Sequence, residues 1–181
     1  TARFCEETGI IRDGFSFQAG SGGTALSIGI YFAEMLKAKG MKSRFARGGS
    51  NAYLVKMLED GLVDYILDGQ TFDLEGVRSM RENPTHVDTS PFTSYNYHSK
   101  GNFAQLVDVV ILGATEVDVH FNANVVTHSD GVLLHGIGGW QNCLFAKCTI
   151  LPIPLFRDRI PVIRETVTTL CGPGELIDVI V

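Results

Sequence analysis

The sequence predicts one α/β domain in which helices cover a mostly parallel sheet. Between residues 15 and 69, short apolar runs alternate with longer segments whose apolar residues recur every three or four positions. This order of strand, helix, strand, helix and strand is typical of parallel sheets with right-handed crossover connections. A nearly continuous apolar run over residues 105–113 adds a strand buried on both faces, as in the middle of such a sheet.

Apolar spacing and end residues define the helices of the first half. A helix is predicted over Thr24–Lys39, because its apolar residues share one face and Gly40 follows as a stop. Ser50 is expected to cap a second helix, Asn51–Asp60, and a third covers Leu74–Arg81. The strands between these helices are expected at residues 15–20, 42–46 and 61–69.

The second half of the chain has a different character. The stretch "NPTHVDTSPFTSYNYHSKGN" after Glu82 has no periodicity, which predicts a long loop. Residues 114–136 alternate and contain a Ser-Asp-Gly turn, which indicates a bent hairpin or β meander attached to the parallel sheet. A short helix is expected at Trp140–Ala146. Further strands are expected within 148–155, 160–170 and 178–181.

Composition narrows the class of partner. The length of 181 residues fits a single domain with a substantial core. A net charge of −5 without a basic cluster argues against nucleic acid and against an anionic membrane. No apolar run is as long as a spanning helix, and no signal-peptide pattern opens the sequence, so a cytoplasmic location is expected.

The cysteines and the two ends of the sequence lead to two further expectations. Four cysteines are too few for a disulfide framework and lack zinc-knuckle spacing, so buried thiols are expected at Cys5, Cys143, Cys148 and Cys171.

The sequence opens without methionine and stops on an apolar run, so we expect a lobe cut from a longer chain.

The first glycine stretch, "QAGSGGTA", lies between a strand and a helix. It is no phosphate-binding P-loop, because no Gly-Lys-Ser/Thr follows. It matches the dinucleotide pattern G-x-G-x-x-G/A, but Arg47 stands where the ribose-binding acid belongs. Arg47 would suit a 2′-phosphate, which leaves a nicotinamide enzyme open, and the helix start could equally hold a carboxylate or the pyrophosphate of coenzyme A. The candidate ligand-binding residues here are Gly20, Ser21, Gly22 and Gly23.

A second stretch, "RGGSN", repeats the order of strand, glycines and helix start. It is either an ordinary connection or a second contact with ligand. The candidates are Arg47, Gly48, Gly49, Ser50 and Asn51.

A third stretch, "LLHGIGGWQNC", places glycines directly before the only tryptophan. Glycines are used where the backbone turns with positive φ or approaches another group closely, so Gly136, Gly138 and Gly139 serve either tight packing or a ligand. Glu116 follows the buried strand, at the end where α/β sheets bind ligands. A carboxylate beside free N–H groups would suit acyl transfer, whereas the plainer interpretation of Glu116 is a solvated acid at a strand end.

Four long stretches carry a resemblance that favours catalysis. "FQAGSGGTALSIGIYFAEML", "GGSNAYLVKMLEDGLVDYILDGQTFD", "GATEVDVHFNANVVTHSDG" and "GIGGWQNCLFAKCTILPIPLFRDRIP" together resemble the alpha subunit of bacterial citrate lyase over nearly the whole chain. More distantly, "ATEVD" followed by "GIGG" is similar to coenzyme A transferases and acetyl-CoA hydrolases. The resemblance implies a coenzyme-A-transferase-like (NagB/RpiA-like) lobe spanning residues 1–181, the C-terminal lobe of a longer two-lobed chain.

The resemblance also implies a reaction and roles for residues. Acetate on the thiol of an acyl carrier protein, or of coenzyme A, would be exchanged for citrate without a metal. Glu116 matches the acyl-accepting glutamate of the wider superfamily, and Gly138 and Gly139 match the oxyanion-binding glycines, with Gly136 beside them. In the citrate lyase branch citrate forms a mixed anhydride directly, so we expect Glu116 to orient substrate or act electrostatically.

The first glycine stretch would then lie near the acyl thioester. Arg47, Ser50 and Asn51 would face the carboxylates of citrate. The implied partners are the citrate lyase beta subunit, the acyl carrier protein or gamma subunit, and further copies of the chain. Two other functions stay open, namely a non-catalytic scaffold lobe of a tandem transferase and a sugar-phosphate isomerase or sensor of similar fold.

Overall fold

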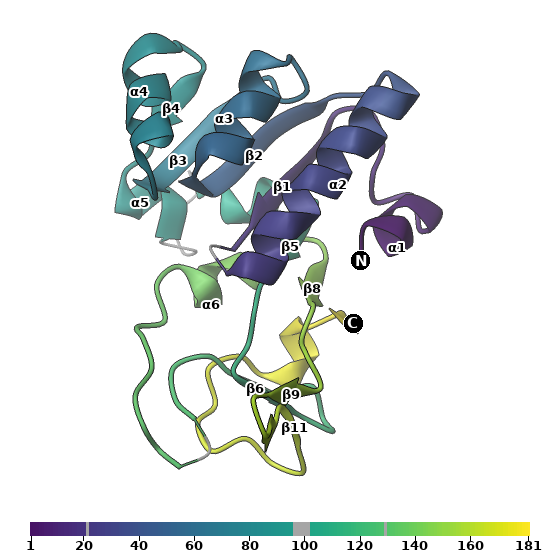
Figure 1. Ribbon diagram of the computed structural model, residues 1–181, viewed down its shortest axis with the longest axis vertical. Helices are drawn as coiled ribbons and strands as arrows, with labels where there is room; N and C mark the ends of the chain where they lie inside the picture. Colours follow the sequence, from purple (N-terminus) through teal and green to yellow (C-terminus); the bar gives the residue numbers. More distant parts are fainter. Residues whose placement is uncertain (21, 96–101, 129) are drawn as a thin grey trace.

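The chain forms a seven-stranded sheet covered by helices, with a smaller β region next to it (Figure 1). The computed structural model describes residues 1–20, 22–95, 102–128 and 130–181. Within these ranges, no helix has the length and apolar character needed to cross a bilayer.

Every pairing in the large sheet is parallel, and its strand order is β12-β8-β5-β1-β2-β3-β4. From the central strand β1 the chain builds β2, β3 and β4 on one side, and then returns to build β5, β8 and β12 on the other. The predicted fold class is therefore confirmed. The strands are β1 Phe15–Ala19, β2 Ser43–Ser50, β3 Ile66–Thr71, β4 His86–Asp88, β5 Val109–Ile111, β8 Thr149–Leu151 and β12 Val179–Ile180.

The three predicted helices of the first half are confirmed as α2 (Gly23–Lys39), α3 (Ala52–Glu59) and α4 (Leu74–Glu82). Gly40 ends α2 with a φ of 63°, a left-handed conformation that favours glycine. Helices α2, α3 and α4 lie across one face of the sheet (Figure 1). The shorter helices are α1 (Ala2–Glu7), which the sequence did not predict, and α5 (Pro91–Tyr95), α6 (Trp140–Cys143), η1 (Ala104–Leu106) and η2 (Gly174–Leu176).

The prediction that Ser50 caps α3 is wrong. Strand β2 continues through Ser50, whose hydroxyl donates to the buried carboxylate of Asp68 on β3. Asn51 caps the helix instead, because its Oδ1 accepts from the N–H groups of Tyr53 and Leu54 at 3.0 and 3.1 Å. The two glycines before Ser50 are therefore strand residues rather than a turn.

The predicted long loop after Glu82 contains regular structure. Strand β4 forms the edge of the sheet, and helix α5 follows it. A three-residue strand of sequence His-Val-Asp is too short to show alternation, which is why the sequence pattern concealed it. Buried His86 joins this strand to its neighbours, since Nδ1 lies 2.8 Å from Ser79 Oγ and Nε2 lies 3.2 Å from Asp68 Oδ2.

The predicted hairpin in the second half is confirmed, but it does not extend the large sheet. Strands β6 (Glu116–Asp118) and β7 (Ala123–Asn124) pair antiparallel, and β11 (Ile163–Arg164) joins β6 in parallel to complete a separate three-stranded sheet. A second hairpin is formed by β9 (Phe156–Arg157) and β10 (Ile160–Pro161). This β region occupies the lower part of Figure 1.

The large sheet has an apolar core on each face, because neighbouring strand residues point in opposite directions. On β5, Val109 and Ile111 pack with the residues of α1, α2 and α3, whereas Val110 packs towards α6 and the small sheet. The predicted central strand is thus confirmed as buried on both faces.

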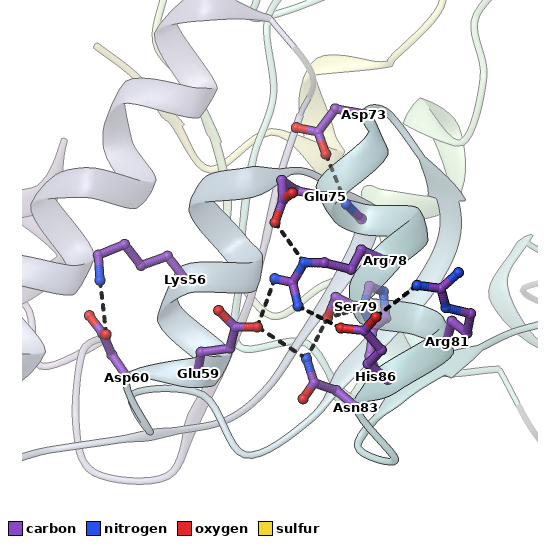
Figure 2. Close-up of polar contacts among 12 residues, drawn as sticks. Lys56, Glu59, Asp60, Asp73, Glu75, Arg78, Ser79, Arg81, Asn83 and His86 are labelled. Carbon is purple, nitrogen blue, oxygen red and sulfur yellow. Dashed lines mark hydrogen bonds and ion pairs between the residues drawn. The ribbon is translucent and has the colours of Figure 1, made fainter.

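An ion pair on the surface links α3 to α4, as Figure 2 shows. Arg78 of α4 contacts Glu59 of α3 at 2.8 Å and, within its own helix, Glu75 at 2.9 Å and Glu82 at 3.1 Å. Asp73 caps α4 by accepting from the N–H of Gly76 at 2.9 Å. Exposed pairs of this kind contribute little to stability, so the packed faces of the two helices hold them in place.

Candidate functional site

The main cavity lies where the strand order reverses. Strands β1 and β5 are neighbours, yet the chain leaves β1 towards β2 and leaves β5 towards β8. Their carboxyl ends meet, and the N–H of Gly20 donates to the carbonyl of Ile111 over 2.8 Å. Open α/β sheets bind ligands at such a point. The cavity there has a volume of about 540 Å³.

All three glycine stretches of the sequence meet at this cavity. The first contributes Gly20 and Gly22, and the second contributes Gly48 and Gly49. The third contributes every one of its glycines. Ser21 lies outside the described residues, and Gly23 begins α2 without lining the cavity. The glycines of the third stretch are Gly136, Gly138 and Gly139, and the other lining residues are Gln18, Ala19, Gln70, Phe72, Leu112, Gly113, Ala114, Thr115, Val125, His135, Ile137, Trp140, Cys143 and Arg157.

The third glycine stretch has the geometry of a turn that faces open space. Gly138 has a φ of 56°, and a Cβ added there would meet no atom within 4 Å. The N–H groups of Gly138 and Gly139 donate no hydrogen bond to any other described residue. Backbone N–H groups that lack an acceptor and lie beside a cavity can donate hydrogen bonds to an oxygen of a ligand.

The second glycine stretch serves packing as well as the cavity. A side chain at Gly49 would overlap the ring of Phe72, and Gly48, with a φ of 103°, lies against the side chain of Gln18. These glycines let Phe72 and Gln18 pack closely on β2.

Trp140 holds the third glycine stretch to the end of β5. Its indole Nε1 donates to the carbonyl of Gly113 over 2.9 Å, and its ring occupies the space that a side chain at Gly172 would need. The tryptophan is 6% exposed and lines the cavity, as expected from its position after the glycines.

Gln18 and Cys143 form a buried contact behind the glycines. Gln18 Nε2 donates to Cys143 Sγ over 2.7 Å, and this thiol donates to the carbonyl of Gly139 over 3.0 Å. Burial raises the pKa of the Cys143 thiol to about 11, so the sulfur keeps its proton at neutral pH. Cys5 and Cys171 are buried like Cys143, as predicted, and Cys148 is partly buried.

The structure does not bring Glu116 to the cavity. Its carboxyl group is buried inside the small sheet, where Oε2 accepts from Asn124 Nδ2 at 2.9 Å and from Thr168 Oγ1 at 3.1 Å. Arg164 Nε lies 3.9 Å from Oε1. Thr115, one residue earlier, lines the cavity instead. Glu116 is therefore not a solvated strand-end acid, and it is not among the residues that line the cavity.

The polar residues of the second stretch also lie elsewhere. Arg47 is buried and donates from Nη2 to the carbonyl of Ser94. Together with Asn51 it borders a much smaller hollow beside α3. Ser50 is buried against Asp68. The arginine that lines the main cavity is Arg157.

The charged side chain in the described lining of the cavity is that of Arg157. That lining contains no aspartate or glutamate, in a chain whose net charge is −5. No group of three or more side chains suited to metal binding occurs within the described ranges. The lining therefore suits an anionic ligand.

Comparison with known proteins decides the family. The family profile for the alpha subunit of citrate lyase matches residues 1–181. The citrate lyase alpha chain of Haemophilus influenzae is 40% identical over 185 residues, which cover 99% of this chain and 37% of that protein. The corresponding protein of Escherichia coli K12 is 37% identical, over 96% of this chain and 34% of its own.

The chain belongs to the citrate lyase alpha subunit family. It spans about a third of the length of these relatives. A solved structure described as the alpha subunit of citrate lyase from Streptococcus mutans, in complex with citrate, is 36% identical and superposes with a TM-score of 0.95. It covers 99% of this chain and 36% of its own.

A more distant structure supports the fold alone. The malonate decarboxylase alpha subunit from Acinetobacter baumannii is 16% identical, with a TM-score of 0.70 over 97% of this chain and 40% of its own. The citrate lyase alpha fold is thus confirmed for this segment.

Several cavity residues of this citrate lyase alpha segment were not among the predicted ones, and Gln18 and Arg157 are two of them. Gln18 is a polar residue in the strand "FSFQA", directly before the glycine turn, and that position was a usable signal. Arg157 lies 43 residues beyond Ala114, whose carbonyl it contacts, in a hairpin without a distinctive pattern, and the sequence contained no comparable signal for it.

Proposed function

We propose that the cavity is the site of a citrate transferase reaction, in which acetate on a carrier thiol is exchanged for citrate. The overall change is acetyl-acyl-carrier-protein plus citrate to citryl-acyl-carrier-protein plus acetate, with coenzyme A as an alternative thiol. The observation that supports it most is that the N–H groups of Gly138 and Gly139 have no acceptor among the described residues and lie in a cavity whose described lining contains no acidic side chain. Membership of the citrate lyase alpha family supplies the substrates.

The reaction consists of two acyl transfers. An oxygen of a citrate carboxylate attacks the acetyl carbonyl carbon, and the C–S bond breaks with its electron pair leaving on sulfur as a thiolate. The thiolate then attacks the citryl carbonyl of the resulting mixed anhydride, and the C–O bond breaks to release acetate with its electron pair. These two acyl transfers require no metal and no net transfer of a proton.

The chain's own contribution is positioning and charge stabilisation. Each step develops a negative charge on a carbonyl oxygen, which the N–H groups of Gly138 and Gly139 would bind. Gly136 shapes the same turn. Trp140 keeps the turn fixed by its bond to Gly113, so the donors need no reorganisation during the reaction.

Glu116 acts in this proposal as a positioning residue. Its bonds to Asn124 and Thr168 connect β6, β7 and the segment after β11. These elements stand directly behind Thr115 and Val125, which line the cavity. Because the citrate carboxylate is itself the nucleophile, no protein carboxylate is needed for attack.

The remaining glycine residues would lie along the thioester substrate. Gly20 and Gly22 line the cavity just before α2, so the pantetheine arm would pass there, with Ser21 and Gly23 as the neighbouring candidates in the sequence. Gly48 and Gly49 form part of the wall. Arg47, Ser50 and Asn51 support that wall from behind through Ser94, Asp68 and the start of α3, rather than touching citrate.

We also propose a cellular location and partner subunits for the protein. The segment would be the C-terminal lobe of a two-lobed cytoplasmic polypeptide that forms homo-oligomers and works with the citrate lyase beta subunit and the acyl carrier protein. Nucleic acid and membranes are not among the proposed partners.

The direct test is a transfer assay on the complete polypeptide. With acetyl-CoA or acetylated carrier and citrate, we expect acetate and a citryl thioester in equal amounts. Calorimetric titrations with NADPH and ribose 5-phosphate separate the alternatives. Tight binding of either compound without thioester exchange would contradict the proposal, and an inert lobe would be a scaffold.

A further inference from the structure

Arg157 is a cation at the cavity without a carboxylate partner. It belongs to the β9–β10 hairpin, where it pairs with Ile160, and its side chain reaches across to the segment between β5 and β6. There Nη2 lies 3.5 Å from the carbonyl oxygen of Ala114, the outer limit of a hydrogen bond. Within the described ranges, no ion pair joins Arg157 to an acidic side chain.

This placement leaves most of the guanidinium group available. An arginine has five N–H donors, and the long contact with Ala114 uses one of them weakly. The side chain is partly buried, and no acidic residue shares the described lining. A partly desolvated charge is unfavourable unless it meets an opposite charge, so the geometry favours an anion that arrives with the substrate.

We infer that Arg157 recognises a carboxylate of the acyl acceptor, citrate, and determines the preference for a tricarboxylate. This inference rests on the proposed function and goes beyond it by naming the recognition residue. A planar guanidinium and a carboxylate form two parallel charged hydrogen bonds, an arrangement that a lysine cannot make.

Citrate is a better match than the phosphates of coenzyme A, although both offer anionic oxygens. Arg157 shares its cavity with Gly138 and Gly139, where the acyl group reacts. The acceptor must bring one carboxylate to that point, so its other carboxylates remain within the same cavity. The pantetheine arm, in contrast, separates the phosphates of coenzyme A from the reacting sulfur.

The hairpin itself supplies a matched control. Arg159 lies two residues further along, is exposed and does not line the cavity. Replacing Arg157 or Arg159 by glutamine removes the same charge from the same hairpin, and only the first change removes it from the cavity.

The test compares the complete polypeptide with its R157Q, R157K and R159Q variants. Calorimetry gives the Kd for citrate, for citramalate, which lacks one of the carboxylates, and for coenzyme A. We expect R157Q to weaken citrate binding on the order of 10- to 100-fold and to abolish the preference for citrate over citramalate. R157K should retain part of the affinity, and R159Q should stay within about 2-fold of the parent, as expected for an exposed charge.

The outcomes separate this inference from the proposed function. Citrate binding that depends on Arg157 would support the inference even if the transfer assay showed no exchange. Equal effects of R157Q and R159Q would overturn it. Weaker coenzyme A binding with unchanged citrate binding would also overturn it, since Arg157 would then bind a phosphate. If R157Q fails to fold, as judged by circular dichroism, R157K decides the question by the same comparison.

Discussion

The indole N–H of Trp140 donates to the carbonyl of Gly113 over 2.9 Å, and this bond joins the glycine turn at residues 136–139 to the carboxyl end of β5. The only tryptophan of the chain therefore fixes the distance between two walls of the cavity. Its ring also fills the space beside Gly172.

Trp140→Phe should loosen the turn while it leaves most of the ring packing in place. Loss of one hydrogen bond predicts a stability decrease of about 1 kcal/mol in denaturant unfolding. The kcat of the folded variant should also fall, beyond any loss that comes from unfolded protein, because the N–H groups that bind the oxyanion lose their fixed position. In the parent protein, the tryptophan fluorescence should respond to an acyl thioester. A fluorescence signal that does not change at saturating acetyl-CoA would contradict this placement.

Glu116→Gln should preserve the contacts of the small sheet better than Glu116→Ala. The alanine variant leaves Asn124 and Thr168 without their shared acceptor, so we expect it to lose about 1–3 kcal/mol of stability and part of its turnover. The glutamine variant should lie between the alanine variant and the parent.

The chemistry at Glu116 can be tested separately. Because citrate attacks the thioester itself, steady-state kinetics should be sequential, and borohydride or hydroxylamine should trap no label on the protein during turnover. Isolation of a modified Glu116 peptide would show that the residue attacks the thioester. Unchanged activity and stability in Glu116→Ala would remove it from the account.

Gly49→Ala should destabilise the protein, because its new methyl group would overlap the ring of Phe72. Overpacking of this kind costs about 1–3 kcal/mol. In the Gly49→Ala, Phe72→Ala double variant the added cost of the methyl group should be small. If the cost persists without the Phe72 ring, packing does not explain the glycine.

The contacts of the Asp108 carboxylate predict that the folded protein loses stability in acid. Burial alone would raise the pKa of its carboxyl group. The donors around it have the larger, opposite effect: Lys147 at 2.7 Å, the N–H of Ser16 at 2.9 Å and Arg12 at 3.1 Å together hold this pKa below the ordinary 3.8. The unfolded chain therefore takes up the proton more readily than the folded chain. The stabilisation is complete above the unfolded pKa and is lost as the pH falls through the folded pKa.

The measurement is the free energy of unfolding between about pH 5 and pH 2. We expect a decline that begins near pH 4 in the parent and is shallower in Asp108→Asn. Asp88→Asn, which changes an exposed aspartate on β4, serves as the control and should decline like the parent. Identical slopes in the parent and in Asp108→Asn would contradict the assignment.

The helices and the position of the cavity could be predicted because their causes are local. Apolar spacing and Gly40 define α2, and the alternation of strands and helices leads to a parallel sheet with its site at the carboxyl ends. The first glycine stretch follows β1 and the second ends β2, so the topology brings these two together, whereas the third lies between β7 and α6 and reaches the cavity by tertiary packing.

The side chains at the site depended on causes that are not local. Strand β6 has only three residues, Glu116–Asp118, too few for an alternation that reveals which face each residue takes, so Glu116 was expected at the cavity that Thr115 lines. Similarly, Ser50 has the side chain of a helix cap, but Asp68 on the neighbouring strand binds it. Arg157 reaches the site through a hairpin whose position depends on tertiary packing.

The proposed reaction requires that the glycine turn present its N–H groups to the thioester carbonyl. Gly138 and Gly131 both have positive φ values, 56° and 80°, and both face open space, but only Gly138 lines the cavity. Valine at either position imposes a similar backbone strain. The decisive measurement is therefore kcat for acetate–citrate exchange in Gly138→Val and Gly131→Val, with folding checked by circular dichroism. We expect kcat to fall on the order of 10²-fold or more in Gly138→Val alone, with the helices intact in both variants. Equal turnover in the two variants, or a loss in Gly138→Val that only unfolding explains, would contradict it.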